Sequence, residues 1–183
     1  MTISLLLAAA LVAAPLAPAP EPQAAPDPRP LDLLPAFIGA CIDPGPDAKK
    51  IRDAVVKAGG QSAPEQPGKD SADPSRLSGY SFPLPKPYSV IFNGTGTCAI
   101  VSREADVEVT KGSLAGFVAG STAVFDINIP NHPEAKPGET IVSAYVLTSR
   151  QKVGTGMSIT LSKVTRDGAS AIFLSRHLVA IKP

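Results

Sequence analysis

The sequence predicts an α+β domain in which helices pack on one face of a mostly antiparallel sheet. Three patterns indicate this class. Apolar residues recur at helical spacing through residues 48–58, and two short apolar segments, 88–92 and 98–102, flank a glycine-containing turn. Alternating apolar and polar residues then recur between residues 124 and 181. The expected order is α–β–β–α, followed by a β-meander.

Length and composition limit the class of protein. The 183 residues suit one domain of about 100–150 residues with a tail. A mean hydropathy of +0.13 with 18% charged residues is too apolar for an intrinsically disordered chain and too mixed for a polytopic membrane protein. Because the net charge is only +1, nucleic acid is excluded as the dominant partner.

The N-terminal segment has the pattern of a secretory signal peptide. Residues 3–12 form an apolar run that is shorter than the roughly 20 residues of a transmembrane helix, and small residues follow it. Cleavage is expected near Ala24 or Ala25, although no basic residue precedes the run. The chain then divides into a signal peptide (1–25), a Pro/Ala-rich linker (26–35) and one α+β domain (36–183). An uncleaved N-terminal anchor is the alternative. We otherwise expect no transmembrane domain and a periplasmic or secreted protein.

The two cysteines predict one disulfide, Cys41–Cys98, because exported proteins fold in an oxidising compartment. Closing a loop of about 58 residues would stabilise the fold by roughly 4 kcal/mol. There are three alternatives to the disulfide: free structural thiols, a catalytic cysteine, or a lipid on Cys41. The lipid is considered because Cys41 ends a lipobox-like segment at residues 38–41. Two isolated cysteines and two isolated histidines show no ligand spacing, so we expect no metal and no other cofactor.

The first half of the domain should contain two helices and a long loop. A short helix is expected within 31–41. Asp47 is a suitable N-cap for the helix at 48–58, which Gly59 and Gly60 end. Residues 61–87 contain six prolines and are expected to form an irregular loop.

The second half should be mostly strands. Residues 104–120 fit either a strand or a helix, and Asp106 as an N-cap favours the helix. Asp167-Gly168 predicts a tight hairpin turn between the last two strands. Four strands are expected, at residues 124–129, 141–148, 157–164 and 171–181.

Motifs of the common enzyme classes are absent from the sequence. The glycines at 94–96 and 154–156 do not lead into a phosphate-binding Lys-Ser/Thr, and there is no Gly-x-Ser-x-Gly. His132 in a Pro-rich loop and His177 in a strand are the candidate general bases, although surface or edge positions are the plainer interpretation of both. With no Trp and 5% aromatic residues, stacking on sugars or bases is not favoured.

One charge asymmetry remains. Residues 141–183 contain six basic side chains and one acidic side chain, a net charge of +5. If the meander displays Lys152, Lys163, Arg166 and Arg176 on its open face, they form a basic patch for an anionic surface or partner. Alternatively, these side chains protect exposed strands from edge pairing.

Three features of the sequence resemble a known family: the segment from Phe37 through Cys41, the helix after it, and Cys98-Ala99-Ile100-Val101. In these features the chain is similar to a family of small uncharacterised exported proteins of proteobacteria, over about residues 36–180. That family has one early cysteine and a second at a strand start. The resemblance implies export and the disulfide, and it implies no activity.

These observations favour a non-enzymatic periplasmic or envelope binding domain. Its basic meander face would bind an envelope protein or an anionic envelope component. The alternative function is a small exported hydrolase that uses His177 or His132 together with a hydroxyl and a carboxylate.

Overall fold

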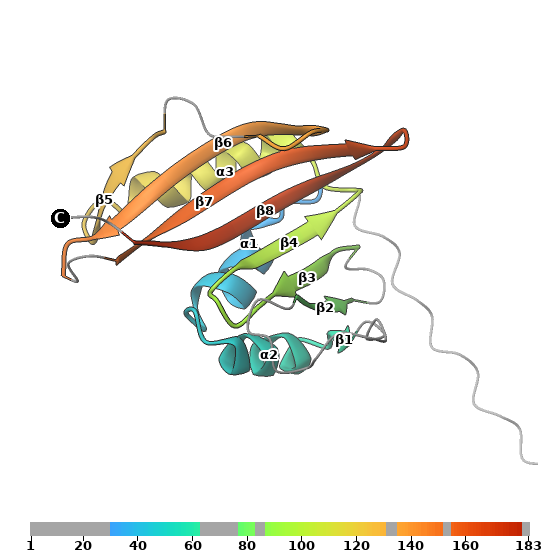
Figure 1. The fold of residues 1–183 in the computed structure, drawn as a ribbon, viewed down its shortest axis with the longest axis horizontal. Helices are drawn as coiled ribbons and strands as arrows, with labels where there is room; N and C mark the ends of the chain where they lie inside the picture. Colours follow the sequence, from blue (N-terminus) through green and yellow to red (C-terminus); the bar gives the residue numbers. More distant parts are fainter. Residues whose placement is uncertain (1–29, 63–76, 83–86, 131–134, 152–154, 181–183) are drawn as a thin grey trace, which may run out of the picture.

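Figure 1 shows the fold in a computed structural model, which describes residues 30–62, 77–82, 87–130, 135–151 and 155–180. The expected signal peptide, residues 26–29 of the expected linker, His132 and Lys152 lie outside the described residues. Among the helices that the structure describes, none is long and apolar enough to cross a membrane.

The described residues form one eight-stranded sheet with the strand order β1-β2-β3-β4-β8-β7-β6-β5. Each neighbouring pair is antiparallel. The mixed α+β class and the antiparallel sheet predicted from the sequence are therefore confirmed. The strands are β1 (Gln61–Ser62), β2 (Ser78–Ser81), β3 (Ser89–Phe92), β4 (Cys98–Ser102), β5 (Phe125–Asn128), β6 (Glu139–Ser149), β7 (Thr155–Arg166) and β8 (Ala169–Ala180).

Helices contact the sheet at three places. α1 (Leu34–Phe37) continues directly into a π-helical turn, η1 (Ile38–Ile42), and α1 contacts β4 and β8. α2 (Ala48–Lys57) contacts β3, and α3 (Val107–Gly120) contacts β6. In Figure 1, α3 lies behind β6 and β7, and α1 lies behind β8 and β4.

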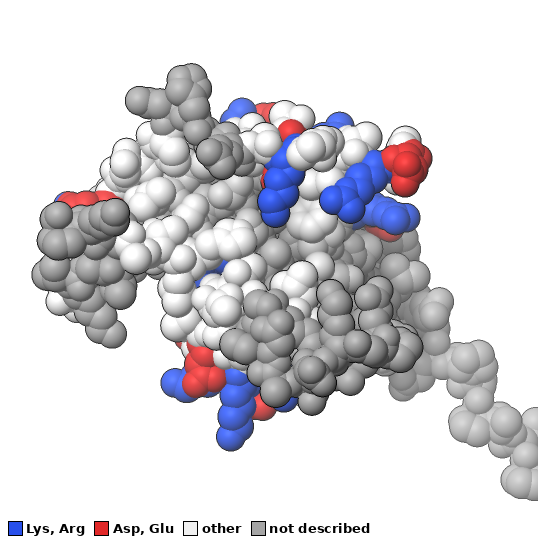
Figure 2. Space-filling view, in the orientation of Figure 1, with Lys and Arg blue, Asp and Glu red and all other residues white. Residues whose placement is uncertain are grey.

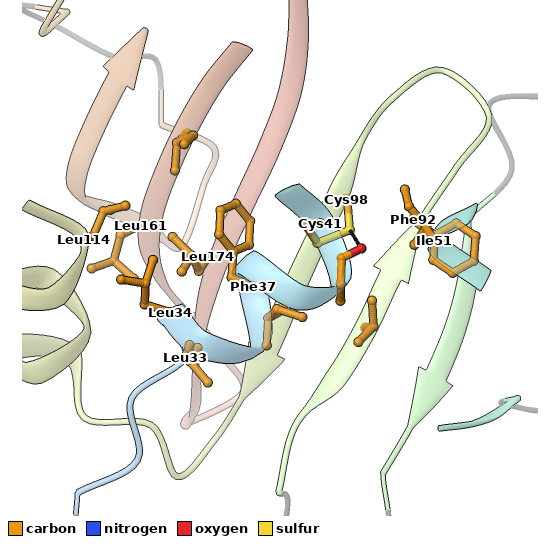
Figure 3. Packing of buried hydrophobic residues seen from close by; sticks show 14 of the residues in the cluster. Leu33, Leu34, Phe37, Cys41, Ile51, Phe92, Cys98, Leu114, Leu161 and Leu174 are labelled. Atoms are coloured by element: carbon orange, nitrogen blue, oxygen red, sulfur yellow. Dashed lines mark hydrogen bonds between the residues drawn. A yellow bond between two sulfur atoms is a disulfide. The ribbon is translucent and has the colours of Figure 1, made fainter. Parts of the chain in front are cut away.

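The core forms where alternate strand residues meet these helices. Ile100, Leu174 and Leu161 lie opposite one another in register on β4, β8 and β7, and all three are fully buried. They belong to one hydrophobic cluster with Phe37 of α1 and Leu114 of α3, shown in Figure 3. We call the sheet surface that carries these buried residues the core face and the opposite surface the open face.

The meander prediction is supported by the order of the last four strands. β5, β6, β7 and β8 pair consecutively, and β8 also pairs with β4, so the β3–β4 hairpin and the meander share one sheet. Asp167 and Gly168 both have positive φ, 50° and 78°, as the hairpin turn between β7 and β8 requires.

Two helix predictions are confirmed with their caps. Asp47 accepts hydrogen bonds at the start of α2 from the backbone N–H groups of Lys49 and Lys50, at 2.8 and 3.3 Å. The ambiguous segment 104–120 contains a helix, and Asp106 caps it by accepting from Glu108 and Val109 at 2.9 and 3.0 Å. These caps satisfy N–H groups that have no partner within the helix.

The prediction that residues 61–87 form an irregular loop is wrong in part. Ser78–Ser81 form β2, which pairs with β3, and the two-residue β1 pairs with β2. Tyr80 is buried and its ring stacks on Phe92, with ring centroids 5.7 Å apart. The inward aromatic side chain of Tyr80 therefore anchors this strand to the core, although the segment has little alternation of apolar and polar residues of its own.

Candidate functional site

An apolar groove lies between the helices and the end of the sheet at β2 and β3. Its volume is about 380 Å³. We call it the α1–α2 groove. It is lined by Asp32, Pro35, Ala36, Gly39 and Ala40 near α1 and η1, by Ala54, Val55 and Ala58 of α2 and its end, and by Phe82, Tyr88 and Val90 beside β2 and β3.

Small side chains on both helical sides leave the groove open. Ala36, Gly39 and Ala40 face it from one helical segment, and Ala54 and Ala58 face it from the other. A Cβ on Gly39 would meet no atom within 4 Å, so there is space beside this backbone. Large side chains at these positions would fill the space that the helices leave between them.

The helical sides are fixed by local hydrogen bonds and by burial. Asp32 accepts a hydrogen bond from the backbone N–H of Leu34 at 2.9 Å, which holds the start of α1. On α2, Ile51 and Val55 are buried in the core, and Asp47 caps the helix. Gly60 lets the chain turn closely past the end of α2, because a Cβ there would lie 2.6 Å from a methyl group of Val55.

An aromatic pair forms the strand side of the groove. The rings of Phe82 and Tyr88 lie 4.8 Å apart between centroids and are tilted by 42°. Val90, beside them on β3, is fully buried. This side offers an apolar surface with one hydroxyl group.

Two polar groups accompany the apolar lining. Burial raises the pKa of the Tyr88 hydroxyl above its usual value, so this group is neutral at physiological pH and has the capacity both to donate and to accept a hydrogen bond. The Asp32 carboxylate has acceptor capacity beyond its bond to Leu34. Among the described lining residues, the groups that can titrate are the Asp32 carboxyl and the Tyr88 hydroxyl, and there is no imidazole or thiol.

The disulfide fixes η1 to the sheet beside this groove. Cys41 in η1 and Cys98 at the start of β4 are bonded, with their Cα atoms 5.5 Å apart, and both are fully buried. Figure 3 shows the bond between the helical segment and the strand. The disulfide predicted from the cysteine count is therefore present in the structure.

Arg176 does not belong to the predicted open-face basic patch, and that prediction is wrong for this residue. Its side chain is only 3% exposed, and its Nη1 donates a hydrogen bond to the Cys41 carbonyl. The reason is register: Arg176 pairs with Cys98 and so shares the core face with it. Burial lowers the pKa of the guanidinium, and within the described part of the chain its Nε and Nη2 have no hydrogen-bond partner.

The other predicted patch residues are not gathered either. Lys163 and Arg166 are both exposed. Lys163 lies opposite the buried Ile172 and is therefore on the core face, whereas Arg166, three residues further along β7, is on the other face. The structure thus does not place these two residues together with Arg176 on one open face.

His177 lies on the open face, away from the groove. Its Nδ1 is 3.2 Å from the Thr97 hydroxyl, and Ser158 lies opposite it on β7. Partial burial of the ring lowers the pKa of His177 below its usual value of 6.5. Within the described residues no carboxylate forms a hydrogen bond to this ring, and no group of three or more metal-ligating side chains is found.

Sequence reasoning missed the groove. Its residues come from three segments, 32–40, 54–58 and 82–90, which no single motif joins. The available signal was the alanine and glycine pattern on two predicted helices, and this pattern becomes meaningful only once the helices are known to be neighbours. Searches against protein-family models, curated proteins and solved structures found no match for this chain. Function must therefore be inferred from the chemistry of the site.

Proposed function

We propose that the protein is a non-enzymatic, exported binding domain whose ligand lies in the α1–α2 groove. The ligand would have a linear apolar body and a cationic, hydrogen-bond-donating end. The observation that supports this most strongly is the groove itself, about 380 Å³ of apolar space with a carboxylate and a hydroxyl among its lining groups.

The size and lining of the groove suit a small ligand. Small-molecule sites usually have volumes of about 300–1,000 Å³ and combine apolar walls with a few polar groups. Ala36, Ala54 and Phe82 provide apolar contact, while Asp32 and Tyr88 would orient the ligand. Removing apolar surface from water gives about 25 cal/mol per Å² of favourable free energy, so burial of the ligand body would supply the affinity.

The charge of the ligand follows from Asp32. A carboxylate attracts a cation and repels an anion, and both effects strengthen when the site is partly removed from water. Because Arg176 is buried and Lys163 and Arg166 lie on different faces, we place recognition in the groove rather than on the meander.

Export is supported by the disulfide. Cys41 and Cys98 are bonded, and disulfides persist mainly in oxidising compartments. Together with the expected signal peptide at 1–25, this favours a periplasmic or secreted location.

The test uses a pair of probes that differ only at one end. Octylamine and octanol are titrated separately into ¹⁵N-labelled protein, and backbone NMR shifts are followed at Gly39, Ala58 and Tyr88. We expect shifts at these positions with both probes and a higher affinity for octylamine. Equal affinities, or shifts that occur only outside the groove, would contradict the proposal.

A matched variant tests the role of the carboxylate. Asp32→Asn retains an oxygen that can accept the hydrogen bond from Leu34 but removes the charge. We expect the affinity for octylamine to fall about fivefold and that for octanol to stay within about twofold, as for a partly exposed ion pair. An equal loss with both probes would mean that the substitution perturbs the groove rather than a charge contact.

One observation favours a second candidate function, a small hydrolase. The hydrogen bond between Thr97 and His177 joins a hydroxyl to a candidate general base. Hydrolysis of p-nitrophenyl acetate that is lost in both His177→Gln and Thr97→Val would support it. If the activity equals that of free imidazole and does not change in Thr97→Val, the hydrolase function is contradicted.

A further inference from the structure

The side chains of α2 change character in a regular order around the helix axis. Successive residues of an α-helix are rotated by about 100°, so residues four apart lie on one stripe. Ile51 and Val55 form the stripe that is buried in the core. Ala54 and Ala58 form the neighbouring stripe, about 60° further round, and they line the α1–α2 groove. The groove therefore lies along one side of the buried stripe.

Two lysines form the next stripe outward, which we call the α2 lip. Lys50 precedes Ala54 by four residues and Lys57 follows it by three, so both are its neighbours on the helix surface. Both lysines are exposed. Their mean position is about 70° beyond the alanine stripe, on the side away from the core. The α2 side of the groove mouth therefore carries two ammonium groups.

The other basic side chains of α2 lie away from the groove. Lys49 and Arg52 are exposed and are rotated by about 170° from the stripe of Ala54 and Ala58. Asp53 lies between the two pairs of basic residues. Figure 2 shows basic side chains, with acidic ones beside them, projecting at the lower end of the view, where Figure 1 places α2.

The two charges of the α2 lip are not neutralised within the described part of the chain. Asp53 is three residues from Lys50 and four from Lys57, which are the spacings of helical ion pairs. Nevertheless, neither ammonium group forms an ion pair or a hydrogen bond with a described residue. Both are therefore available to a ligand.

The opposite wall of the groove carries the opposite charge. Asp32 lines the groove beside the start of α1, and its bond with the backbone N–H of Leu34 holds the carboxylate there. Ala36 and Gly39, which follow along the same wall, are uncharged. A negative group on one side of the mouth thus faces a positive lip on the other.

This arrangement restricts the charge of the ligand. A head that is only cationic would pair with Asp32 but would bring a like charge to the α2 lip, and a head that is only anionic would do the reverse. A head with one charge of each sign satisfies both sides. The volume of about 380 Å³ is near the lower end for small-molecule sites, which favours one apolar chain rather than two.

We propose that the α1–α2 groove binds a single-chain zwitterionic amphiphile, in which a phosphodiester joins the apolar chain to a primary amine. The amine pairs with Asp32, and the phosphate oxygens accept hydrogen bonds from Lys50 and Lys57. The chain lies among the alanines and the aromatic pair of the groove. This inference rests on the proposed function and names the class of ligand for the same groove.

The test compares three probes that share or lack one part of this ligand. Octyl phosphoethanolamine has the chain, the phosphate and the amine, octylamine lacks the phosphate, and phosphoethanolamine lacks the chain. Each is titrated at low salt into the ¹⁵N-labelled chain, and backbone NMR shifts are followed at Gly39, Ala58 and Tyr88. We expect octyl phosphoethanolamine to bind about fivefold more tightly than octylamine, as for partly exposed ion pairs. Phosphoethanolamine should show no saturable binding.

Two double variants of α2 locate the charge contact. Lys50→Gln/Lys57→Gln removes the charge of the α2 lip, and Lys49→Gln/Arg52→Gln removes the same charge from the opposite side of the helix. The lip variant should lose the preference for octyl phosphoethanolamine. It should bind octylamine at least as tightly as the unaltered chain, because a repulsion of the ammonium group has been removed. The control variant should keep the preference. Damage to the groove would instead weaken the binding of both chain-bearing probes.

Four results would overturn the inference. They are equal affinities for octyl phosphoethanolamine and octylamine, a preference that survives in the lip variant, a preference lost equally in the control variant, and phosphoethanolamine binding as tightly as its octyl ester. The proposed function stands in each case if octylamine still shifts the groove resonances. If neither chain-bearing probe shifts them, the proposed function and this inference are both contradicted.

Discussion

At the scale of single residues, Arg176 has the most unusual environment. It continues the inward series of Ile172 and Leu174 along β8, where an apolar residue would be expected. Arginine is rarely buried without a partner, so the sequence suggested an exposed position. Its Nη1 instead satisfies the Cys41 carbonyl near the end of η1, where carbonyl groups lack partners within the helix.

Replacing Arg176 with an apolar side chain of similar length should stabilise the fold. Arg176→Met removes two buried donors for which the described residues supply no partner, and it fills much of the same space. We expect the free energy of unfolding in urea to rise by about 1 kcal/mol. Arg166→Met, at an exposed position, is the control and should change it by less than about 0.5 kcal/mol. A loss of stability in Arg176→Met would show that the bond to Cys41 outweighs the two unpaired donors.

His177 should make stability depend on pH. Its pKa is lower in the folded state than the usual 6.5, so the unfolded chain binds more protons around that pH. The stability it contributes is therefore present above the usual pKa and is lost as the pH falls from that value through the lower pKa of the folded state. Between about pH 8 and about pH 5, the unaltered chain should lose more free energy of unfolding than His177→Gln.

The pH measurement is made by urea unfolding of both proteins at each pH. If the unaltered chain and His177→Gln lose the same free energy of unfolding between about pH 8 and about pH 5, the imidazole has the same pKa in the folded and unfolded states, which would contradict the prediction.

At the scale of elements, the sequence predicted the helices and turns whose residues carry a strong local signal. Asp47, Asp106 and the Asp167-Gly168 turn were identified because caps and turns depend on a few neighbouring residues. β2 was missed because its stability comes from pairing with β3 and from the contact between Tyr80 and Phe92. The π-helical turn η1 was also missed, since its hydrogen-bond register has no simple sequence signal.

One buried hydrogen bond joins α1 to α3. The hydroxyl of Thr110, which is fully buried, accepts from the backbone N–H of Leu33 at 3.2 Å. Thr110→Val keeps the shape but leaves that N–H without a partner, so we expect a loss of about 1–3 kcal/mol in the free energy of unfolding. Thr110→Ser keeps the acceptor and should lose only about 1 kcal/mol, the value of one methyl group. Equal losses in the two variants would assign the effect to packing alone.

At the scale of the whole molecule, the disulfide was predictable and the groove was not. Two cysteines allow only one intramolecular pairing, so their count, taken with the expected export, was enough to predict the bond. The groove depends on segments separated by tens of residues, and the open face depends on the register of four strands. Such long-range register also determines which face Arg176 occupies, which is why the basic patch was wrongly assembled from sequence.

Removing the disulfide should weaken the whole fold. Its residues are separated by 57 positions, so the bond restricts a large loop of the unfolded chain. We expect the double variant Cys41→Ala/Cys98→Ala to lose roughly 4 kcal/mol in the free energy of unfolding. Reduction of the unaltered chain should give a similar loss, whereas an effect below about 1 kcal/mol in both cases would show that the loop is already restricted without the bond.

The most direct test of the binding-domain account is to fill the α1–α2 groove from one side. Gly39→Leu adds a side chain where the backbone faces open space, and Gly116→Leu makes the same change on α3, outside the groove. The measurement is the affinity of each variant for octylamine. We expect Gly39→Leu to lose binding by at least about tenfold, or about 1.4 kcal/mol, while Gly116→Leu binds like the unaltered chain. Unchanged binding in a folded Gly39→Leu variant would contradict the account.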